Sequence, residues 1–151
     1  MALPAGVSAC NMCVQLMTAT TWTDASDNMT VVSPPAQTRA SGEAYVFGED
    51  TAVIGVGKRA PMDVTVRGVW VAGTTDPFYN VYLAHTTPCG AMVAVRWGPD
   101  GCTTDKDVFY TSTTKSEVVS LSFPGGDAGS ADIIMYEFVI RTPDVTRAAW
   151  A

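Results

Sequence analysis

The sequence is poor in the residues that usually build helices. Its 151 residues include only four leucines and three lysines, whereas valine and threonine occur nineteen times each. Valine and threonine suit the pleated surface of a β-sheet, while leucine and lysine favour helices. The composition therefore predicts a mainly β protein.

Positive charge is also scarce. Nine lysines and arginines stand against fifteen acids, which gives a formal net charge of −6. A net negative charge disfavours binding to nucleic-acid phosphates, and the small basic group of Arg39, Lys58 and Arg59 does not offset that charge. No apolar run approaches the roughly 18 residues that a membrane-spanning helix needs.

Histidine occurs once, at position 85, so any catalytic triad must use His85. No neighbouring sequence resembles the turn that presents a nucleophilic serine, and the acids are too scattered for a carboxylate pair. We interpret His85 as a structural residue. The sequence predicts no catalytic residue and no enzyme activity.

Two loop segments invite a ligand-binding interpretation. Gly55-Val56-Gly57-Lys58 lacks the first glycine and the final serine or threonine of a phosphate-binding loop. The acids Asp100, Asp105 and Asp107 lack the ligand order of a calcium-binding loop. We interpret the glycines as shaping a strand end and the acids as a solvated turn, so no cofactor-binding or metal-binding residue is expected.

The four cysteines leave three arrangements open. Cys10 and Cys13 have Cys-x-x-Cys spacing, but Cys89 and Cys102 are too far apart for the usual second half of a zinc site. Cys89 and Cys102 flank a predicted strand and could approach across neighbouring strands. The segment before Cys10 is too short for an export signal, so we expect reduced, buried or unreactive thiols.

Strand patterns recur along the chain. Alternation of apolar and polar residues predicts half-buried antiparallel strands over 62–67, 91–97, 118–123 and 133–141. Shorter candidates cover 12–20, 29–33, 43–47 and 53–56, with residues 48–50 as a hairpin connection. Beyond Gly68 both faces become apolar, which predicts a bulge or burial on both sides.

One helix is predicted over about residues 76–86. Asp76 can cap it, Pro77 suits its first position, and a helical spacing places Phe78, Val81, Tyr82 and His85 on one face. The fold class is therefore mainly β, an antiparallel β-sandwich or barrel with one flanking helix. Length and the absence of repeats or linkers predict one domain over 1–151, with extended segments at 1–10 and 143–151.

The order of several short motifs over residues 43–147 resembles that of the tail tube, or major tail, proteins of long-tailed bacteriophages. The motifs lie at 45–48, 57–66, 75–78, 95–101, 110–112, 123–132 and 138–146. The first of them, Tyr45-Val46-Phe47-Gly48, matches a strand motif that such proteins carry. The glycine-rich stretch 125–130 fits a tight turn, where glycine provides positive φ.

The resemblance implies a structural virion protein that assembles in the host cytoplasm. Six subunits of similar proteins form a ring whose strands close a shared inner β-barrel, and the rings stack into a hollow tube through which DNA passes. The implied partners are further copies of the chain, tape measure, terminator and distal tail proteins, with no membrane. The segment 43–67 is the candidate for the inner barrel, and 23–28 and both termini are candidates for contacts between rings.

Two physical arguments agree with this interpretation. Head-to-tail contacts build rings and filaments, and a shared barrel removes the open edges of a sheet. An acidic lumen would repel the DNA backbone. The alternatives are a tail terminator, a capsid decoration protein, or a small-ligand-binding β-barrel with Trp70, Trp97 and Tyr136 in its interior.

Overall fold

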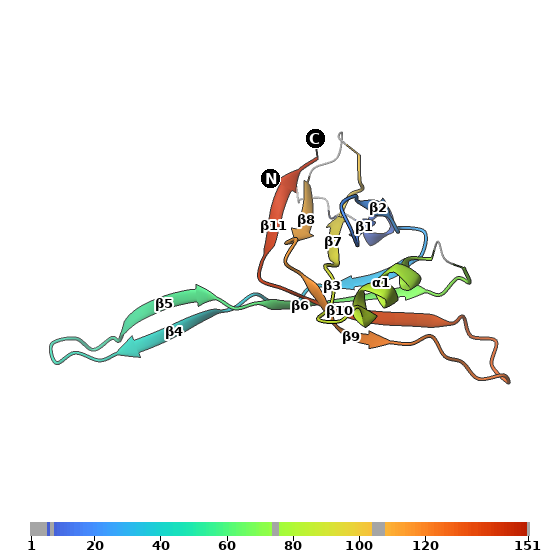
Figure 1. Ribbon diagram of the computed structural model, residues 1–151. Coiled ribbons are helices and arrows are strands. Elements are labelled where there is room, and N and C mark those ends of the chain that lie inside the picture. The colour runs from blue at the N-terminus through green and yellow to red at the C-terminus, as the bar shows by residue number, and fades with distance from the viewer. Residues whose placement is uncertain (1–5, 7, 74–75, 104–107, 151) are drawn as a thin grey trace.

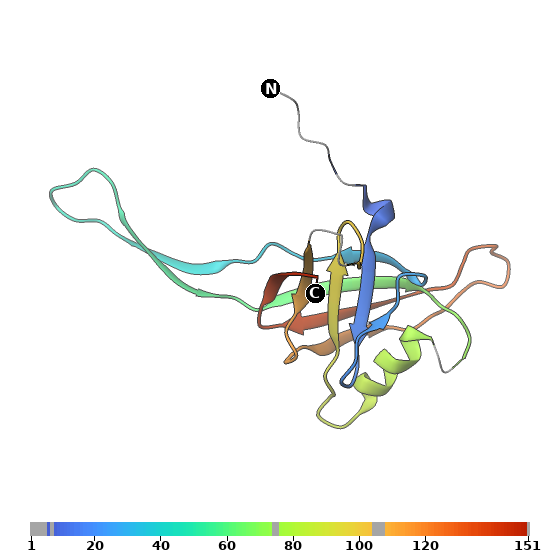
Figure 2. The same ribbon diagram turned by 90° about the horizontal axis from the view of Figure 1, so that it is seen from above.

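Two antiparallel sheets form the body of the protein, and a two-stranded hairpin projects from it (Figure 1). The computed structural model describes residues 6, 8–73, 76–103 and 108–150. Sheet A has the strand order β11-β8-β7-β1-β2, and sheet B has the order β3-β6-β10-β9. Seen from above, the strands of sheet A cross those of sheet B at a steep angle (Figure 2). The predicted mainly β fold with one helix is confirmed.

The elements have the following bounds. Sheet A contains β1 (Cys13–Met17), β2 (Thr23–Asp24), β7 (Ala94–Gly98), β8 (Val108–Ser112) and β11 (Val145–Ala149). Sheet B contains β3 (Met29–Ser33), β6 (Met62–Val69), β9 (Glu117–Ser122) and β10 (Met135–Thr142). The hairpin consists of β4 (Arg39–Ala44) and β5 (Val53–Arg59), the helix is α1 (Pro77–Thr86), and a 3₁₀ turn covers Ala9–Asn11.

The centre of sheet B is the long pair formed by β6 and β10. The two strands pair without interruption from Met135 opposite Val69 to Thr142 opposite Met62. Alternate residues of both strands are buried, so the alternation predicted for 62–67 and, from Tyr136 onward, for 133–141 is confirmed. These buried residues meet side chains of sheet A, including Val14, Leu16 and Val95, in one core between the sheets.

Strand β9 breaks the alternation that we predicted for 118–123. Ile140 of β10 pairs with Val118, whereas the preceding Val139 pairs with Ser120, so Val119 is an extra residue in a bulge. As a result Val118 and Leu121 pack against the core, and Val119 is exposed. The predicted strict alternation, which places Val119 and Leu121 on one face, is therefore wrong, because a bulge shifts the period by one residue.

The region beyond Gly68 also differs from the prediction. Strand β6 ends at Val69, and Trp70 and Val71 are exposed rather than buried. The irregularity lies in the neighbouring strand β3, where the register shifts between Met29 and Val31. Gly68 itself is a site of close approach, because a Cβ atom there would lie 2.8 Å from the Tyr136 hydroxyl oxygen.

Strand β7 is buried on both faces instead of one. Ala94 and Val95 are fully buried although they point to opposite sides of the sheet. The guanidinium carbon of Arg96 lies 4.5 Å from the ring centre of Trp22 and 5.1 Å from those of Phe109 and Trp150. This aromatic cage lies outside the core cluster and holds Trp22 and Trp150 against Arg96 of β7.

The helix begins at Pro77 as expected, but the cap residue Asp76 and the packed face of the helix differ from the prediction. The Asp76 side chain is buried and makes no cap hydrogen bond with the described residues. Burial raises the pKa of Asp76, against the opposing effect of the backbone N–H groups of Phe78 and Val71. Ala84 joins Val81 in the core, while His85 is exposed, so the helical face predicted from the spacing packs only in part.

Aromatic contacts hold α1 against sheet B. The Phe78 ring lies 5.1 Å from that of Tyr136 and 6.3 Å from that of Phe123, measured between centroids. Tyr82 lies 6.2 Å from Phe123. The aromatic side of the helix therefore packs on the ends of β9 and β10.

Strands β8 and β11 were not among the strands expected from the sequence. They pair with one another from Val145 opposite Ser112 to Ala149 opposite Val108. The C-terminal segment 143–151, expected to be extended, thus contributes an edge strand to sheet A. The alternation in both strands is weak, because four of the five residues of β8 are partly buried and four of the five residues of β11 are exposed.

A disulfide joins Cys13 to Cys102, and the expectation of unreactive thiols is wrong for these two residues. Cys13 pairs with Gly98 across β1 and β7, and the Gly101 N–H donates to the Gly98 carbonyl in a turn after β7. That turn returns the chain to β1 and brings the two Cα atoms within 5.6 Å. Cys10 and Cys89 are free and exposed, so no zinc set of four cysteines forms.

Cys102→Ser will destabilise the fold strongly. The disulfide spans a sequence separation of 89 residues. By reducing the entropy of the unfolded chain, a cross-link of that span stabilises the folded state by about 4–5 kcal/mol in the chain-entropy account. We expect a large drop in the melting temperature under non-reducing conditions. Cys89→Ser, which removes a free thiol, is the control and should melt like the wild type. A wild-type melting temperature that reductant leaves unchanged would contradict this role.

Gly68→Ala will also destabilise the protein. The new methyl group would meet the Tyr136 hydroxyl at 2.8 Å and the Asn28 carbonyl oxygen at 3.0 Å, and overpacking of this kind costs about 1–3 kcal/mol. Urea unfolding measures the change. Gly42→Ala is the control, since nothing lies within 4 Å of a Cβ atom at Gly42. Equal losses for the two variants would refute the close-approach argument.

Candidate assembly interface

The hairpin is the most exposed part of the structure. All residues of β4 and β5 are exposed, and Figure 1 shows the hairpin extending away from both sheets. Its apolar side chains include Val53, Ile54 and Val56, and the connecting loop adds Tyr45 and Phe47. An isolated two-stranded hairpin is marginally stable in water, and exposed apolar patches mark interaction sites. The hairpin is therefore a candidate contact surface.

The hairpin differs from the predicted one in its bounds. We expected a strand over 43–47 and a connection at 48–50, but β4 ends at Ala44 and the connection runs over 45–52. The motif Tyr45-Val46-Phe47-Gly48 thus lies in the loop. Gly55 and Gly57 lie inside β5, as strand residues rather than at a strand end.

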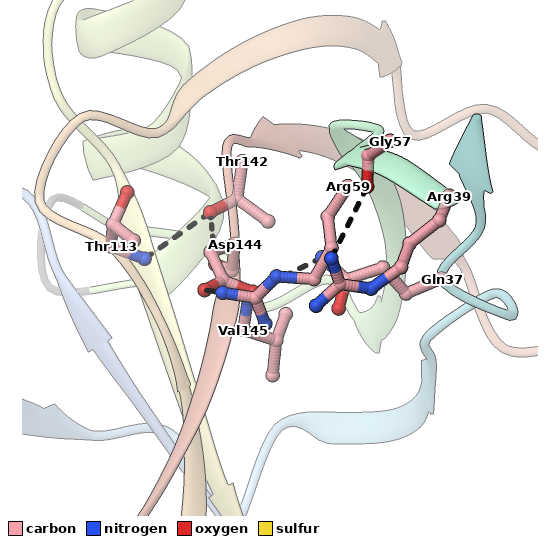
Figure 3. Close-up of polar contacts among 8 residues, drawn as sticks. All are labelled: Gln37, Arg39, Gly57, Arg59, Thr113, Thr142, Asp144 and Val145. Carbon is pink, nitrogen blue, oxygen red and sulfur yellow. Dashed lines mark hydrogen bonds and ion pairs between the residues drawn. The ribbon is translucent and has the colours of Figure 1, made fainter. Parts of the chain in front are cut away.

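Asp144 anchors the root of the hairpin to the body (Figure 3). One carboxylate oxygen accepts hydrogen bonds from the Gln37 side-chain amide at 3.1 Å and from the Val145 N–H at 2.8 Å. The other forms an ion pair with Arg59 at 2.6 Å. Gln37 precedes β4 and Arg59 ends β5, so one side chain in the turn between β10 and β11 holds both arms.

The surroundings of Asp144 keep it ionised and in place. The hydrogen bond from Gln37, together with the Val145 N–H and Arg59, lowers the pKa of Asp144. The Thr142 hydroxyl donates to the Asp144 carbonyl at 2.7 Å and accepts from the Thr113 N–H at 3.2 Å. Since the pKa is lowered, this anchor is intact at neutral pH and is lost only as the pH falls through that lowered value.

Sheet B has two open edges, β3 and β9. In the order β3-β6-β10-β9 each is paired with one strand only, and β9 adds a single bridge from its first residue, Glu117, to Met92. All three pairings within the sheet are antiparallel, so β3 of one copy and β9 of another would also meet antiparallel if the sheet continued. An open edge is a template for a further strand.

The segment 43–67, our candidate for an inner barrel, is divided by the structure. Its first part belongs to the projecting hairpin, and its last part belongs to β6 in sheet B. Only the second part lies in the sheet that has two open edges. The whole of sheet B is therefore the better candidate for a shared barrel wall.

The outward face of sheet B carries paired charges. Arg141 contacts Asp63 at 2.8 Å, and Arg67 contacts Glu137 at 2.6 Å, in both cases across the β6–β10 pair. The hydrogen bond from Arg141 lowers the pKa of Asp63. These four residues compensate one another, so this part of the face is close to neutral.

An open groove of about 440 Å³ lies at the end of sheet B from which the hairpin emerges. Its lining residues combine three cations, one acid and three apolar side chains: Arg59, Lys115, Arg141, Glu117, Pro61, Val119 and Pro143. Arg59 and Arg141 already contact Asp144 and Asp63. Lys115 and Glu117 therefore remain as one cation and one acid without an ion pair to a described residue, beside the three apolar side chains of the lining.

The loop between β9 and β10 projects from the opposite end of sheet B (Figure 1). A turn is present at Asp127, whose carbonyl accepts from the Ser130 N–H and whose carboxylate accepts from the Gly129 N–H. The predicted turn at 125–130 is confirmed. Its predicted cause is wrong, because none of the glycines at 125, 126 and 129 has a positive φ.

The remaining expectations about site residues have the following outcome. Within the described ranges, no three His, Cys, Asp or Glu side chains gather where they could hold a metal ion. Asp105 and Asp107, expected in a solvated turn, lie outside the described residues. Among the described residues, no helix has the length and apolar character needed to cross a membrane.

Comparison with known proteins identifies the fold. No protein-family model and no curated protein matches the chain. Among solved structures, a chain of the anti-feeding prophage cap, described as a tube-terminating cap, matches with a TM-score of 0.73 and 16% identity, over 99% of this chain and 95% of that one. The fold is tail-tube-like.

Two further structures share this tail-tube-like fold. A chain of the sheath-tube complex of the PVC extracellular contractile injection system has a TM-score of 0.71 and 15% identity, over 95% of this chain and 92% of that one. A chain of the native gene transfer agent virion has a TM-score of 0.62 and 9% identity, over 95% of this chain and 100% of that one. The likeness therefore extends to several phage-like tail particles.

Asp144→Ala will loosen the hairpin without unfolding the body. The ion pair with Arg59 is partly exposed, so we expect a change of less than about 1 kcal/mol in the global free energy of unfolding. Trypsin should cleave the variant faster at Arg39, Lys58 and Arg59. Asp127→Ala, which removes a carboxylate far from the root, is the control. Equal cleavage rates for the wild type and Asp144→Ala would show that Asp144 is no anchor.

Proposed function

We propose that this chain is a structural subunit of the tail tube of a phage-like tail particle. Copies form rings, each of six subunits, and the rings stack into a hollow tube. The observation that carries the proposal is a tail-tube-like fold over nearly the whole chain, in which one sheet has both edges open. The role is structural, without catalysis or a cofactor.

The ring forms when sheet B continues from one subunit to the next. Strand β3 of one copy pairs with β9 of its neighbour, and the alternation of strand direction is preserved around the ring. Closure of the barrel removes every open edge of sheet B. The contact is heterologous, because two different edges meet.

The outward face of sheet B lines the lumen in this arrangement. Its arginines at 67 and 141 already bind the carboxylates of Glu137 and Asp63, so they are not available to hold phosphates. Passing DNA therefore meets a wall that is close to neutral, rather than the acidic lumen expected from the net charge. In the particle, the tube contacts tape measure, terminator and distal tail proteins.

A tail terminator is the second candidate. It is favoured by the likeness to a chain of the PVC sheath/tube terminator, with a TM-score of 0.73 and 17% identity over 98% of this chain. A terminator would stop at a single ring. The ligand-barrel alternative loses its main support, because Trp97 and Tyr136 are buried in the core and Trp70 is exposed.

Electron microscopy of the purified protein over a concentration series tests the proposal. We expect hollow tubes or stacked rings, and Val31→Lys on the edge strand β3 should raise the protein concentration needed for rings by about tenfold. Val71→Lys is a matched control, since Val31 is 42% exposed and Val71 49% exposed, but Val71 lies outside the sheet. A protein that stays monomeric at every concentration would overturn the proposal, and single rings without tubes would favour the terminator.

A further inference from the structure

The groove at the hairpin end of sheet B has no partner within the described chain. Its cation Lys115 forms no ion pair with a described residue, and the exposed Val119 of the β9 bulge lies beside it. Pro61 and Pro143 complete the apolar part of the lining. A complementary partner would bring a carboxylate to Lys115 and a small apolar segment to Pro61, Val119 and Pro143.

The loop between β9 and β10 has these properties. Residues 123–134 contain two acids, Asp127 and Asp132, and no base. The remaining residues are small or apolar, and Ile133 is 70% exposed although it has no polar atom in its side chain. The loop is therefore acidic and partly apolar, so it can offer a carboxylate to Lys115 and an apolar side chain to the prolines and Val119 of the groove.

The loop of one chain cannot reach the groove of the same chain. Residues 135–141 of β10 separate the loop from Arg141 in the groove, a span of about 20 Å along a strand. Figure 1 shows the loop directed away from the hairpin end. The loop and groove thus face opposite ways along the strands of sheet B, which suits a head-to-tail contact between two copies.

We infer that the groove binds the β9–β10 loop of a second copy of this chain. The Asp132 carboxylate meets Lys115 at the rim, and Ile133 covers the apolar lining between Pro61 and Val119. This inference rests on the proposed tube function, where it supplies the contact between successive rings, whereas the edges of sheet B supply the contact within a ring. The contact is open-ended, because each bound copy presents a free groove at its far end.

Charge reversal tests the contact. Lys115→Glu and Asp132→Lys should each leave rings intact and raise the protein concentration needed for tube growth by about tenfold or more, because like charges then face each other. The double variant Lys115→Glu/Asp132→Lys restores the attraction and should grow tubes again. Asp100→Lys makes the same charge change as Asp132→Lys in the turn after β7, outside the groove, the hairpin and the loop, and is the matched control.

Sedimentation and electron microscopy distinguish the outcomes. Tubes that grow equally well in both single variants, or a double variant that does not recover, would overturn the inference while rings continued to support the proposed function. A wild-type protein that forms no rings would overturn the proposed function itself. Lys115→Gln and Asp132→Asn, which remove charge without reversing it, should give smaller effects in the same direction and guard against misfolding of the reversed variants.

Discussion

The uninterrupted pairing of β6 with β10 is the constraint on which the rest of the structure depends. It aligns two strands of equal length, so that one face buries Val64, Val66, Phe138 and Ile140 while the other face pairs arginines with carboxylates. A slip of one residue would exchange these faces and expose the whole apolar set. Gly68 is part of the same constraint, because only a residue without a side chain lets Tyr136 lie across β6.

The protrusions of the molecule follow from the order of strands around this pair. The hairpin is inserted between β3 and β6, which are neighbours in sheet B, and the acidic loop joins β9 to β10, which are neighbours on the other side. Since β6 and β10 are antiparallel, the two insertions leave the sheet at opposite ends. The topology therefore gives the subunit two different ends and two open sides, and an assembly of such subunits has a direction.

Period-2 alternation predicted the central strands correctly because they are buried on one face and solvated on the other. It failed where a bulge at Val119 shifted the period, and at β7, where the cage around Arg96 buries a second face. The disulfide between Cys13 and Cys102 could not be read from spacing, since it depends on a turn that follows a paired strand. The contacts at the hairpin root were not predicted for a similar reason. Asp144 lies far along the chain from Gln37 and Arg59, and a single charged residue shows no periodicity that would indicate its partner.

The hairpin has a kinetic consequence for the proposed tube. Strands β4 and β5 are exposed in the free subunit, so only their mutual pairing and the anchor at Asp144 offset the conformational entropy lost when they are ordered. When two free subunits first associate, the hairpins of both must become ordered. A subunit that joins an existing assembly contacts hairpins that are already ordered. Initiation is therefore slow relative to elongation. Growth of tubes from purified subunits would therefore begin after a lag, and preformed rings added to the solution would shorten that lag.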